Sequence, residues 1–320
     1  MEEQYWENSF PDESYLEESS DAHSIYRVDF KEGFGRMTAY NVMPGVTLIF
    51  NDFHTSSGFE NEMRRPGMVE INHCRVGRYE CALRDGSTVS LGPLDFAVSD
   101  MGCPPRISSF TYGEYHGISL VVEIAVAQSA LKDFLGNDAP DLTALFNQIF
   151  YEHTVLILKA DSKIQQLFSD LYEAPTFCRG AYFKLKAAEL FLFLECRKNG
   201  FAADVRRYLS HDLAERIREI EHRMTQDLRL HIPIAELAAH YKMSETTIKK
   251  RFLQLYGEPP YVYLKRRRME TAAFLLETSE LSVSEIAARV GYQNASKFSK
   301  SFCDIYGIVP REYKKGALSG

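Results

Sequence analysis

Short apolar and alternating stretches, separated by turn residues, dominate the chain from about residue 24 to residue 124. Apolar and polar residues alternate in most of them, which is typical of strands with one buried face. The Asp85-Gly86 pair between two alternating stretches is typical of a β-hairpin. Many short strands at regular spacing favour a β-sandwich or a β-barrel. We predict strands at residues 46–50, 68–75, 79–83, 88–91, 94–98 and 118–124.

The apolar period becomes helical after residue 124, with helices predicted at 125–135, 161–172 and 180–198. The helix at 180–198 is apolar over a wide arc, because every residue from Leu190 to Leu194 is apolar. Packing against one neighbour covers only a stripe of a helix. The remaining apolar surface therefore predicts a second contact, either with another copy of the chain in a homodimer or with the C-terminal domain.

One residue pattern occurs twice near the C-terminus. An apolar segment at 234–239 leads to Ser244 and a basic helix, and a segment at 285–292 leads to Asn294 and a second basic helix. An apolar helix, a tight turn with a polar cap and a basic helix are typical of a helix-turn-helix, whose second helix enters the DNA major groove. The chain is therefore predicted to bind double-stranded DNA through two such motifs. Longer helices are predicted at 211–228 and 260–277.

The spacing within each basic helix predicts which side chains face DNA. Ile248 and Phe252 lie four residues apart and should face inward, and Phe298 and Phe302 repeat this pair. The residues predicted to face DNA or to cap the helices are Ser244, Thr246, Lys249, Lys250 and Arg251 in the first motif and Asn294, Ala295, Ser296, Lys297 and Lys300 in the second.

These residues can contribute in two ways, which the sequence leaves open. Lys249 and Lys250 can hydrogen-bond to base edges, or they can form with Arg251 a solvated basic face that contacts only phosphates. Ala295 can offer only a methyl contact to thymine, so the second helix should discriminate less between sequences than the first. A further basic run at 265–268 is more typical of a solvated helix face with ion pairs.

Charge is distributed unevenly along the chain. The whole chain has a net charge of −7, whereas residues 211–320 hold 18 Lys and Arg against 14 Asp and Glu, a net of +4. DNA binding must therefore come from a locally basic face. Residues 1–22 contain eight acidic and no basic residues, and we expect them to form a disordered acidic arm.

Composition also bears on the compartment of the protein. The N-terminal residues lack the features of a signal peptide, and no apolar run approaches the ~20 residues that span a bilayer. The six cysteines form no C-x-x-C pair and no disulfide framework. We therefore expect a cytoplasmic protein without a membrane segment.

Residues 230–316 resemble the DNA-binding domain of the AraC/XylS family of bacterial transcription regulators. The resemblance is carried by a linker motif that begins Pro260-Tyr261 and by a second motif that begins Ser284-Glu285. The chain departs from the family pattern at Tyr292, where Phe is usual, and at Lys314, where Arg is usual. The matching positions are Pro260, Tyr261, Tyr263, Leu264, Ala272, Ala273, Leu275, Leu276, Ile286, Ala287, Gly291, Phe298, Phe302, Tyr306, Gly307, Pro310 and Tyr313.

This resemblance implies an α+β architecture with two functions. It implies a cupin-like β-barrel that senses a small-molecule effector at 23–124, a helical linker and dimerisation region at 125–205, and a DNA-binding domain at 211–318. It assigns base contacts to Thr246, Lys249 and Lys250, and it implies activation through RNA polymerase, with repression as the alternative. Residues 79–96 also resemble, over a short stretch, the sensor half of siderophore-responsive members.

Other classes of function are less compatible with the sequence. A metal-dependent barrel enzyme needs clustered ligands, whereas His23, His54, His73, His116 and His153 are isolated along the chain, so no metal site is expected. A DNA-repair alkyltransferase needs a nucleophilic cysteine in a Pro-Cys-His-Arg context, and the segment that begins Gly102-Cys103-Pro104 lacks the histidine. A purely architectural DNA binder would leave the first 200 residues without a role. We therefore expect no enzymatic activity and no cofactor.

Overall fold

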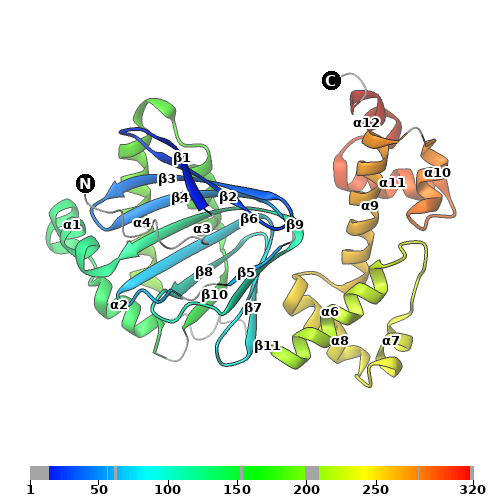
Figure 1. The fold of residues 1–320 in the computed structure, drawn as a ribbon, viewed down its shortest axis with the longest axis horizontal. Helices are drawn as coiled ribbons and strands as arrows, with labels where there is room; N and C mark the ends of the chain where they lie inside the picture. The colour runs from blue at the N-terminus through cyan, green and yellow to red at the C-terminus, as the bar shows by residue number, and fades with distance from the viewer. Residues whose placement is uncertain are drawn as a thin grey trace. The chain divides into compact units, whose positions relative to one another are not determined.

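The computed structural model describes residues 14–55, 57–60, 63–151, 154–198, 209–279 and 281–317. The chain divides into two compact units, residues 1–208 and residues 209–320 (Figure 1). The first unit is an antiparallel sheet with helices packed on it, and the second is helical. No helix in the described ranges is both long enough and apolar enough to cross a membrane.

The N-terminal unit is built on antiparallel strands that follow the order β1-β2-β3-β4-β9-β6-β7. Beside this path, β8 pairs with both β6 and β10, and β5 pairs with β9. The strands are β1 (Ser14–Ser19), β2 (Ser24–Asp29), β3 (Phe34–Met43), β4 (Val46–His54), β5 (Phe59–Glu60), β6 (Met68–Ala82), β7 (Ser87–Leu91), β8 (Asp95–Asp100), β9 (Ile107–Glu123) and β10 (Val155–Lys159).

Strands β6 and β9 curl the sheet. They pair from Met68–Glu123 to Ala82–Ile107, and the register shifts near Cys74 and again near Gly77. Such bulges bend a strand and increase its twist. On its other edge β6 pairs first with β8 and then with β7, so the sheet closes partly on itself as a half-barrel (Figure 1). The predicted α+β architecture, with a barrel-like sheet followed by an all-helical domain, is confirmed.

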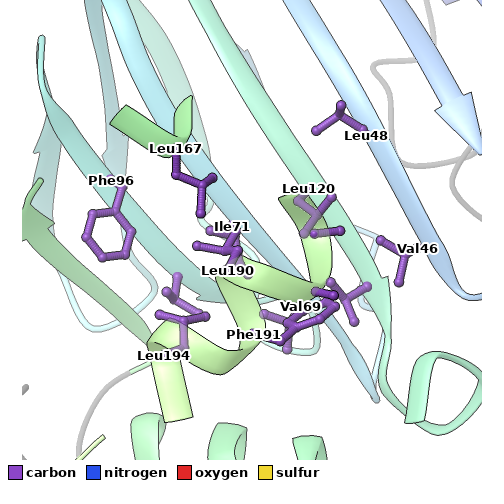
Figure 2. Close-up of a cluster of buried hydrophobic side chains, with 14 of the residues drawn as sticks. Val46, Leu48, Val69, Ile71, Phe96, Leu120, Leu167, Leu190, Phe191 and Leu194 are labelled. Carbon is purple, nitrogen blue, oxygen red and sulfur yellow. The ribbon is translucent and has the colours of Figure 1, made fainter. Parts of the chain in front are cut away.

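Helices cover the outer face of this sheet. They are α1 (Ile124–Leu135), α2 (Leu142–Ile149), α3 (Ser162–Tyr172) and α4 (Arg179–Arg197), with short 3₁₀ turns η2 (Gly136–Asp138) and η3 (Thr176–Cys178). Leu190, Phe191 and Leu194 of α4 pack into one cluster with Val69, Ile71 and Leu120 of the sheet (Figure 2). Burial of apolar side chains stabilises a fold by roughly 25 cal/mol per Å², so this cluster is a main source of cohesion in the unit.

Two sequence expectations for this unit were wrong. Residues 14–19, expected to lie in a disordered arm, form β1, which pairs with β2 as an edge strand. The rest of the expected arm up to residue 13 lies outside the described residues. The region 125–205, expected to be helical, contributes β10, which pairs with β8 over its whole length. A short apolar run such as 155–158 fits a strand or a helix equally, and only its pairing decides between them.

The C-terminal unit consists of helices around α9, which joins its two halves. Its second half has a core made by Met269 and Leu276 of α9 with Phe298 and Phe302 of α11. Helix α9 begins with Pro260. A backbone N–H at the first helical position has no acceptor within the helix, so proline, which lacks this N–H, loses no hydrogen bond there. The elements are β11 (Leu209–Ser210), α6 (His211–Thr225), α7 (Ile234–His240), α8 (Glu245–Tyr256), α9 (Pro260–Thr278), α10 (Val283–Arg289), α11 (Ala295–Tyr306) and α12 (Pro310–Ala317).

Candidate nucleic-acid interface and ligand cavity

Helices α7 and α8 form the first helix-turn-helix. The turn between them places Lys242 in the left-handed backbone region, with φ of 52°. The Ser244 hydroxyl then accepts a hydrogen bond from the backbone N–H of Thr247 at 3.1 Å, which caps α8. Gly257, with φ of 76°, ends the helix.

Helices α10 and α11 form the second helix-turn-helix. A reciprocal capping box between Ser282 and Glu285 begins α10. Gly291, with φ of 84°, makes the turn. The Asn294 side chain accepts hydrogen bonds from the backbone N–H groups of Ser296 and Lys297, at 2.9 and 3.1 Å, and so caps α11.

The two motifs are near repeats that differ by one residue in the turn. Lys242 and Gly291 hold the left-handed position of each turn and are 49 residues apart, whereas the caps Ser244 and Asn294 are 50 residues apart. The second turn therefore contains one additional residue between its first helix and its cap. Helices α8 and α11 have the same length of 12 residues.

The inward pairs expected from the sequence are buried. Ile248, Phe252, Phe298 and Phe302 are each 0% exposed. Anchored in this way, each recognition helix keeps its polar side facing solvent. Of the sequence-predicted DNA-binding residues, Ser244, Thr246, Lys249, Lys250, Asn294, Ala295, Ser296, Lys297 and Lys300 are exposed and Arg251 is half-buried.

Two of these basic side chains have partners within α8. The Lys249 ammonium lies 3.2 Å from the Glu245 carboxylate, one turn away. The Arg251 guanidinium donates to the Gln254 side chain at 2.8 Å. An exposed i,i+4 ion pair stabilises by only ~0.3–0.5 kcal/mol, so a phosphate or a base can displace Glu245 at small cost.

The basic run at 265–268 differs from the exposed basic residues of α8 and α11, because its side chains form ion pairs and hydrogen bonds within the domain. Lys265 lies 3.2 Å from Asp304, Arg266 bridges two carboxylates, and Arg267 lies 3.1 Å from Glu270. The Arg268 guanidinium donates to the backbone carbonyl of Leu230 at 3.0 Å. Lys265 and Arg268 therefore connect α9 to other segments, whereas Arg266 and Arg267 pair with Glu270 within α9, as expected for a solvated face with ion pairs.

The N-terminal unit contains a cavity of about 140 Å³ inside the half-barrel. Its walls are mostly apolar and aromatic, and its lining residues come from strands that are distant in sequence. They include Phe30, Met37, Ile49, Phe53, Phe59, Tyr79, Leu91, Phe110, Tyr115, Val121 and Ile157. A mostly apolar cavity with a few converging polar groups is the usual form of a small-molecule site.

Two polar side chains of the cavity lining contact Glu70. Its carboxyl group is hydrogen-bonded by the side chains of Ser119 and Asn72. Burial raises the pKa of Glu70, and the two hydrogen bonds oppose this shift. Glu70 is not among the residues predicted from the sequence, although a charged residue on the inward side of an alternating strand is a visible signal.

A second group of polar residues lies on the opposite face of the sheet. Asp52 pairs in register with His116 of β9, and His54 lies two residues further along β4. One oxygen of Asp52 lies 2.9 Å from Nε2 of His54 and 3.1 Å from Nδ1 of His116. Although the histidines are isolated along the chain, strand register brings two of them together with a carboxylate, and register cannot be derived from residue spacing.

His73 is a buried histidine with a different role. It is 4% exposed, and its ring stacks on Phe168 of α3 with centroids 4.2 Å apart. Burial lowers the pKa of His73 to about 4, and the nearby positive charge of Arg75 contributes. His73 therefore acts as a neutral ring in the contact between sheet and helices.

Two helix-turn-helix motifs joined by one long helix define the C-terminal unit as a DNA-binding domain of the helix-turn-helix class. Residues 237–316 match a protein family described as a helix-turn-helix domain. The transcriptional activator RhaR of Cronobacter sakazakii is 35% identical over 89 residues, covering 27% of this chain and 31% of that protein. A putative AraC-like transcription regulator of Streptomyces lividans is 35% identical over 82 residues, covering 26% and 27%.

Among solved structures, the C-terminal domain of the response regulator yesN from Fusobacterium nucleatum is 30% identical. It covers 32% of this chain and 98% of that one, with a TM-score of 0.29. The C-terminal domain of this chain is therefore a helix-turn-helix domain similar to those of AraC-like transcription regulators. The chain spans less than half the length of the curated relatives it matches.

Proposed function

We propose that the protein is an effector-responsive transcription regulator that binds promoter DNA through α8 and α11. The observation that supports this most is the duplicated motif, in which each recognition helix is capped, anchored by a buried aromatic or aliphatic pair, and basic on its exposed side. Two such helices in one domain fit successive segments of the major groove, about 34 Å apart along the duplex.

The half-barrel cavity supports the effector-sensing part of the proposal. It is enclosed by a unit that is compact on its own, and it combines apolar walls with a carboxyl group. The proposed output is activation through contact with RNA polymerase, and repression from the same DNA site is the alternative. A promoter-reporter assay with the binding site placed upstream of, or overlapping, the polymerase site distinguishes the two.

The proposal also includes a homodimer formed through α4. Leu185 and Leu192 lie two helical turns apart on α4 and are 58% and 38% exposed, whereas Leu190 and Leu194 are buried in the sheet contact. The exposed leucines form a second apolar stripe that a partner copy would cover.

A salt titration of DNA binding by the full chain tests the DNA-binding function. Each Lys or Arg that neutralises a phosphate releases counterions, so affinity should fall steeply with salt. The double variant Lys249→Ala, Lys297→Ala should bind more weakly and show a shallower salt dependence. Lys132→Ala, at an exposed site on α1, is the matched control and should behave as the parent chain. Salt-independent binding by the parent chain would contradict the proposal.

A further inference from the structure

We propose that the half-barrel cavity binds a small organic ammonium ion, with its charged nitrogen beside Glu70 and its apolar body against the aromatic wall. This inference rests on the effector-responsive function proposed above and names the chemical class of the effector. It is carried by the direction of the hydrogen bonds in the cavity, by the aromatic wall and by the cavity's size.

The hydrogen bonds in the cavity lead toward Glu70 from two sides. Asn51 Nδ2 donates to Ser119 Oγ at 2.9 Å, so the Ser119 hydroxyl hydrogen can donate to Glu70. On the other side, the Tyr115 hydroxyl donates to Asn72 Oδ1 at 2.5 Å, which leaves the Asn72 amide to donate to Glu70. Both series of hydrogen bonds therefore end at the Glu70 carboxyl group, which accepts them. A carboxylate offers about four acceptor positions, so positions remain for a ligand donor.

The charges of the cavity also favour a cationic ligand. Among the described residues, the groups that shift the pKa of Glu70 include no lysine and no arginine. An ionised carboxylate in such a place is costly unless a counter-charge accompanies it. A ligand ammonium supplies that charge. Arg65 and Asp100 also line the cavity, so its lining carries two carboxyl groups against one guanidinium.

The aromatic wall suits a cation. Phe110 is the centre of this wall, with ring centroids 5.0 Å from Phe53, 5.4 Å from Tyr115 and 5.9 Å from Tyr79. Aromatic faces attract ammonium groups, and desolvation strengthens the attraction. The cavity volume of about 140 Å³ is close to that of an engineered cavity of roughly 150 Å³ that binds benzene. One ring with a short amine chain therefore matches the available space.

The test uses three probes of one shape: benzylamine as the cation, benzyl alcohol as the neutral form and benzoate as the anion. Calorimetric titration of the full chain should show that benzylamine binds best. Glu70→Gln keeps the shape and removes the charge, and it should weaken benzylamine binding roughly 10- to 100-fold while leaving benzyl alcohol unchanged. Lys132→Ala, at an exposed site on α1, is a control that should bind all three probes as the parent chain does.

Several results would overturn the proposal. These are tighter binding of benzoate, equal binding of the alcohol and the amine, no binding of benzylamine, or an unchanged benzylamine affinity in Glu70→Gln. Gel shifts with the same proteins in the absence of probe keep the two proposals apart. If the parent chain does not bind DNA, the proposed regulatory function is wrong. The calorimetric result, by contrast, tests only the ligand of the cavity.

A different observation, on the opposite face of the sheet, carries a second inference. We infer that Asp52, His54 and His116 form a binding site for a zinc-type divalent metal ion. One ligand atom from each residue lies within 4.8 Å of the other two. Bonds of ~2.0–2.2 Å to nitrogen and oxygen place ligand atoms roughly 3–4 Å apart, so small rotations of these side chains suffice.

The geometry at Asp52 supports a shared ion. Its Oδ1 is shielded from solvent, and neither imidazole nitrogen near it has the orientation of a hydrogen-bond donor. These two nitrogens and Asp52 Oδ1 are close enough together to coordinate one ion. Arg36 is opposite Asp52 on β3, but its guanidinium binds Glu17 at 2.8 Å. All three side chains are part-exposed, so water can complete the coordination.

Zinc titration of the metal-free full chain tests this site. One Zn²⁺ should bind, and His116→Ala or Asp52→Asn should weaken its affinity by at least about tenfold. His23→Ala is the matched control, because His23 is also a part-exposed histidine beside a carboxylate, in the turn that leads into β2. Equal zinc affinity in the His116→Ala variant and the parent chain, or equal weakening in His23→Ala, would overturn the inference. Circular dichroism of each variant should match that of the parent chain.

Discussion

Lys242 and Gly291 occupy equivalent positions in the two helix-turn-helix turns, and both have left-handed backbone angles, 52° and 84°. A side chain in this region costs roughly 1–2 kcal/mol, so the first turn carries strain that glycine relieves in the second. The surroundings also differ. A Cβ atom at Gly291 would lie 2.3 Å from the carbonyl oxygen of Leu228 and 2.9 Å from the Arg268 guanidinium.

This difference predicts that Gly291→Ala is strongly destabilising. The substitution should cost at least about 3 kcal/mol, because backbone strain and overlap with a backbone oxygen add together. Gly307→Ala is the matched control, since Gly307 has φ of 75° but nothing within 4 Å of the added Cβ. It should cost only about 1 kcal/mol. Urea unfolding followed by helical circular dichroism measures both, and equal losses would contradict the steric argument.

Lys249→Ala and Lys297→Ala are expected to relax different parts of the DNA site. The two residues are exposed on different recognition helices, so the affected segments should lie about one helical turn apart. If each contact is to a base, the loss of discrimination should be ~1–3 kcal/mol at that segment. Selection of sites from randomised DNA measures this. The same altered segment for both variants would rule out two reading helices, and a uniform loss for all sequences would indicate phosphate contacts.

Stability should depend on pH through His73. The folded protein keeps this ring neutral down to a pKa of about 4, whereas the unfolded chain protonates it near 6.5. The unfolded state therefore binds more protons between these values, and stability falls as the pH falls from 6.5 to 4, by roughly 3 kcal/mol in total. His73→Phe should flatten this part of the melting-temperature profile. His23→Phe, at a more exposed site, should leave it unchanged, and the same slope in His73→Phe would show that other groups control it.

Leu192→Asp is expected to convert a dimer into a folded monomer. The substitution would place a charge in the proposed contact between two α4 helices, where it has no partner. Sedimentation measures the oligomeric state, and Ser129→Asp on the exposed side of α1 is the control. An unchanged dimer with altered DNA affinity would instead assign the stripe to contact with the DNA-binding domain.

Local sequence rules predicted the C-terminal domain well, because its determinants are local. Ile248 and Phe252 are spaced for one helix face, and Ser244 and Asn294 are strong caps, so the motif is visible within about 20 residues. Ion pairs were also predicted for the basic run at 265–268, and Lys265, Arg266 and Arg267 form them.

The features that escaped prediction depend on strand pairing between distant segments. Strand β1 is polar and exposed along most of its length, and only pairing with β2 makes it a strand. The Asp52–His116 neighbourhood follows from β4–β9 register, and the Glu70 network joins β6 to β9. A one-residue slip in either pairing would disperse these groups, so residue spacing alone could not reveal them.

The additional residue in the second turn and the different side chains on α8 and α11 have a geometric consequence. If both helices enter the groove, a single molecule meets two unlike half-sites, and its binding sequence has no internal symmetry. Such a sequence has a direction along the duplex. Inverting it would turn the rest of the protein away from the start of transcription, so orientation as well as distance would determine whether a gene responds.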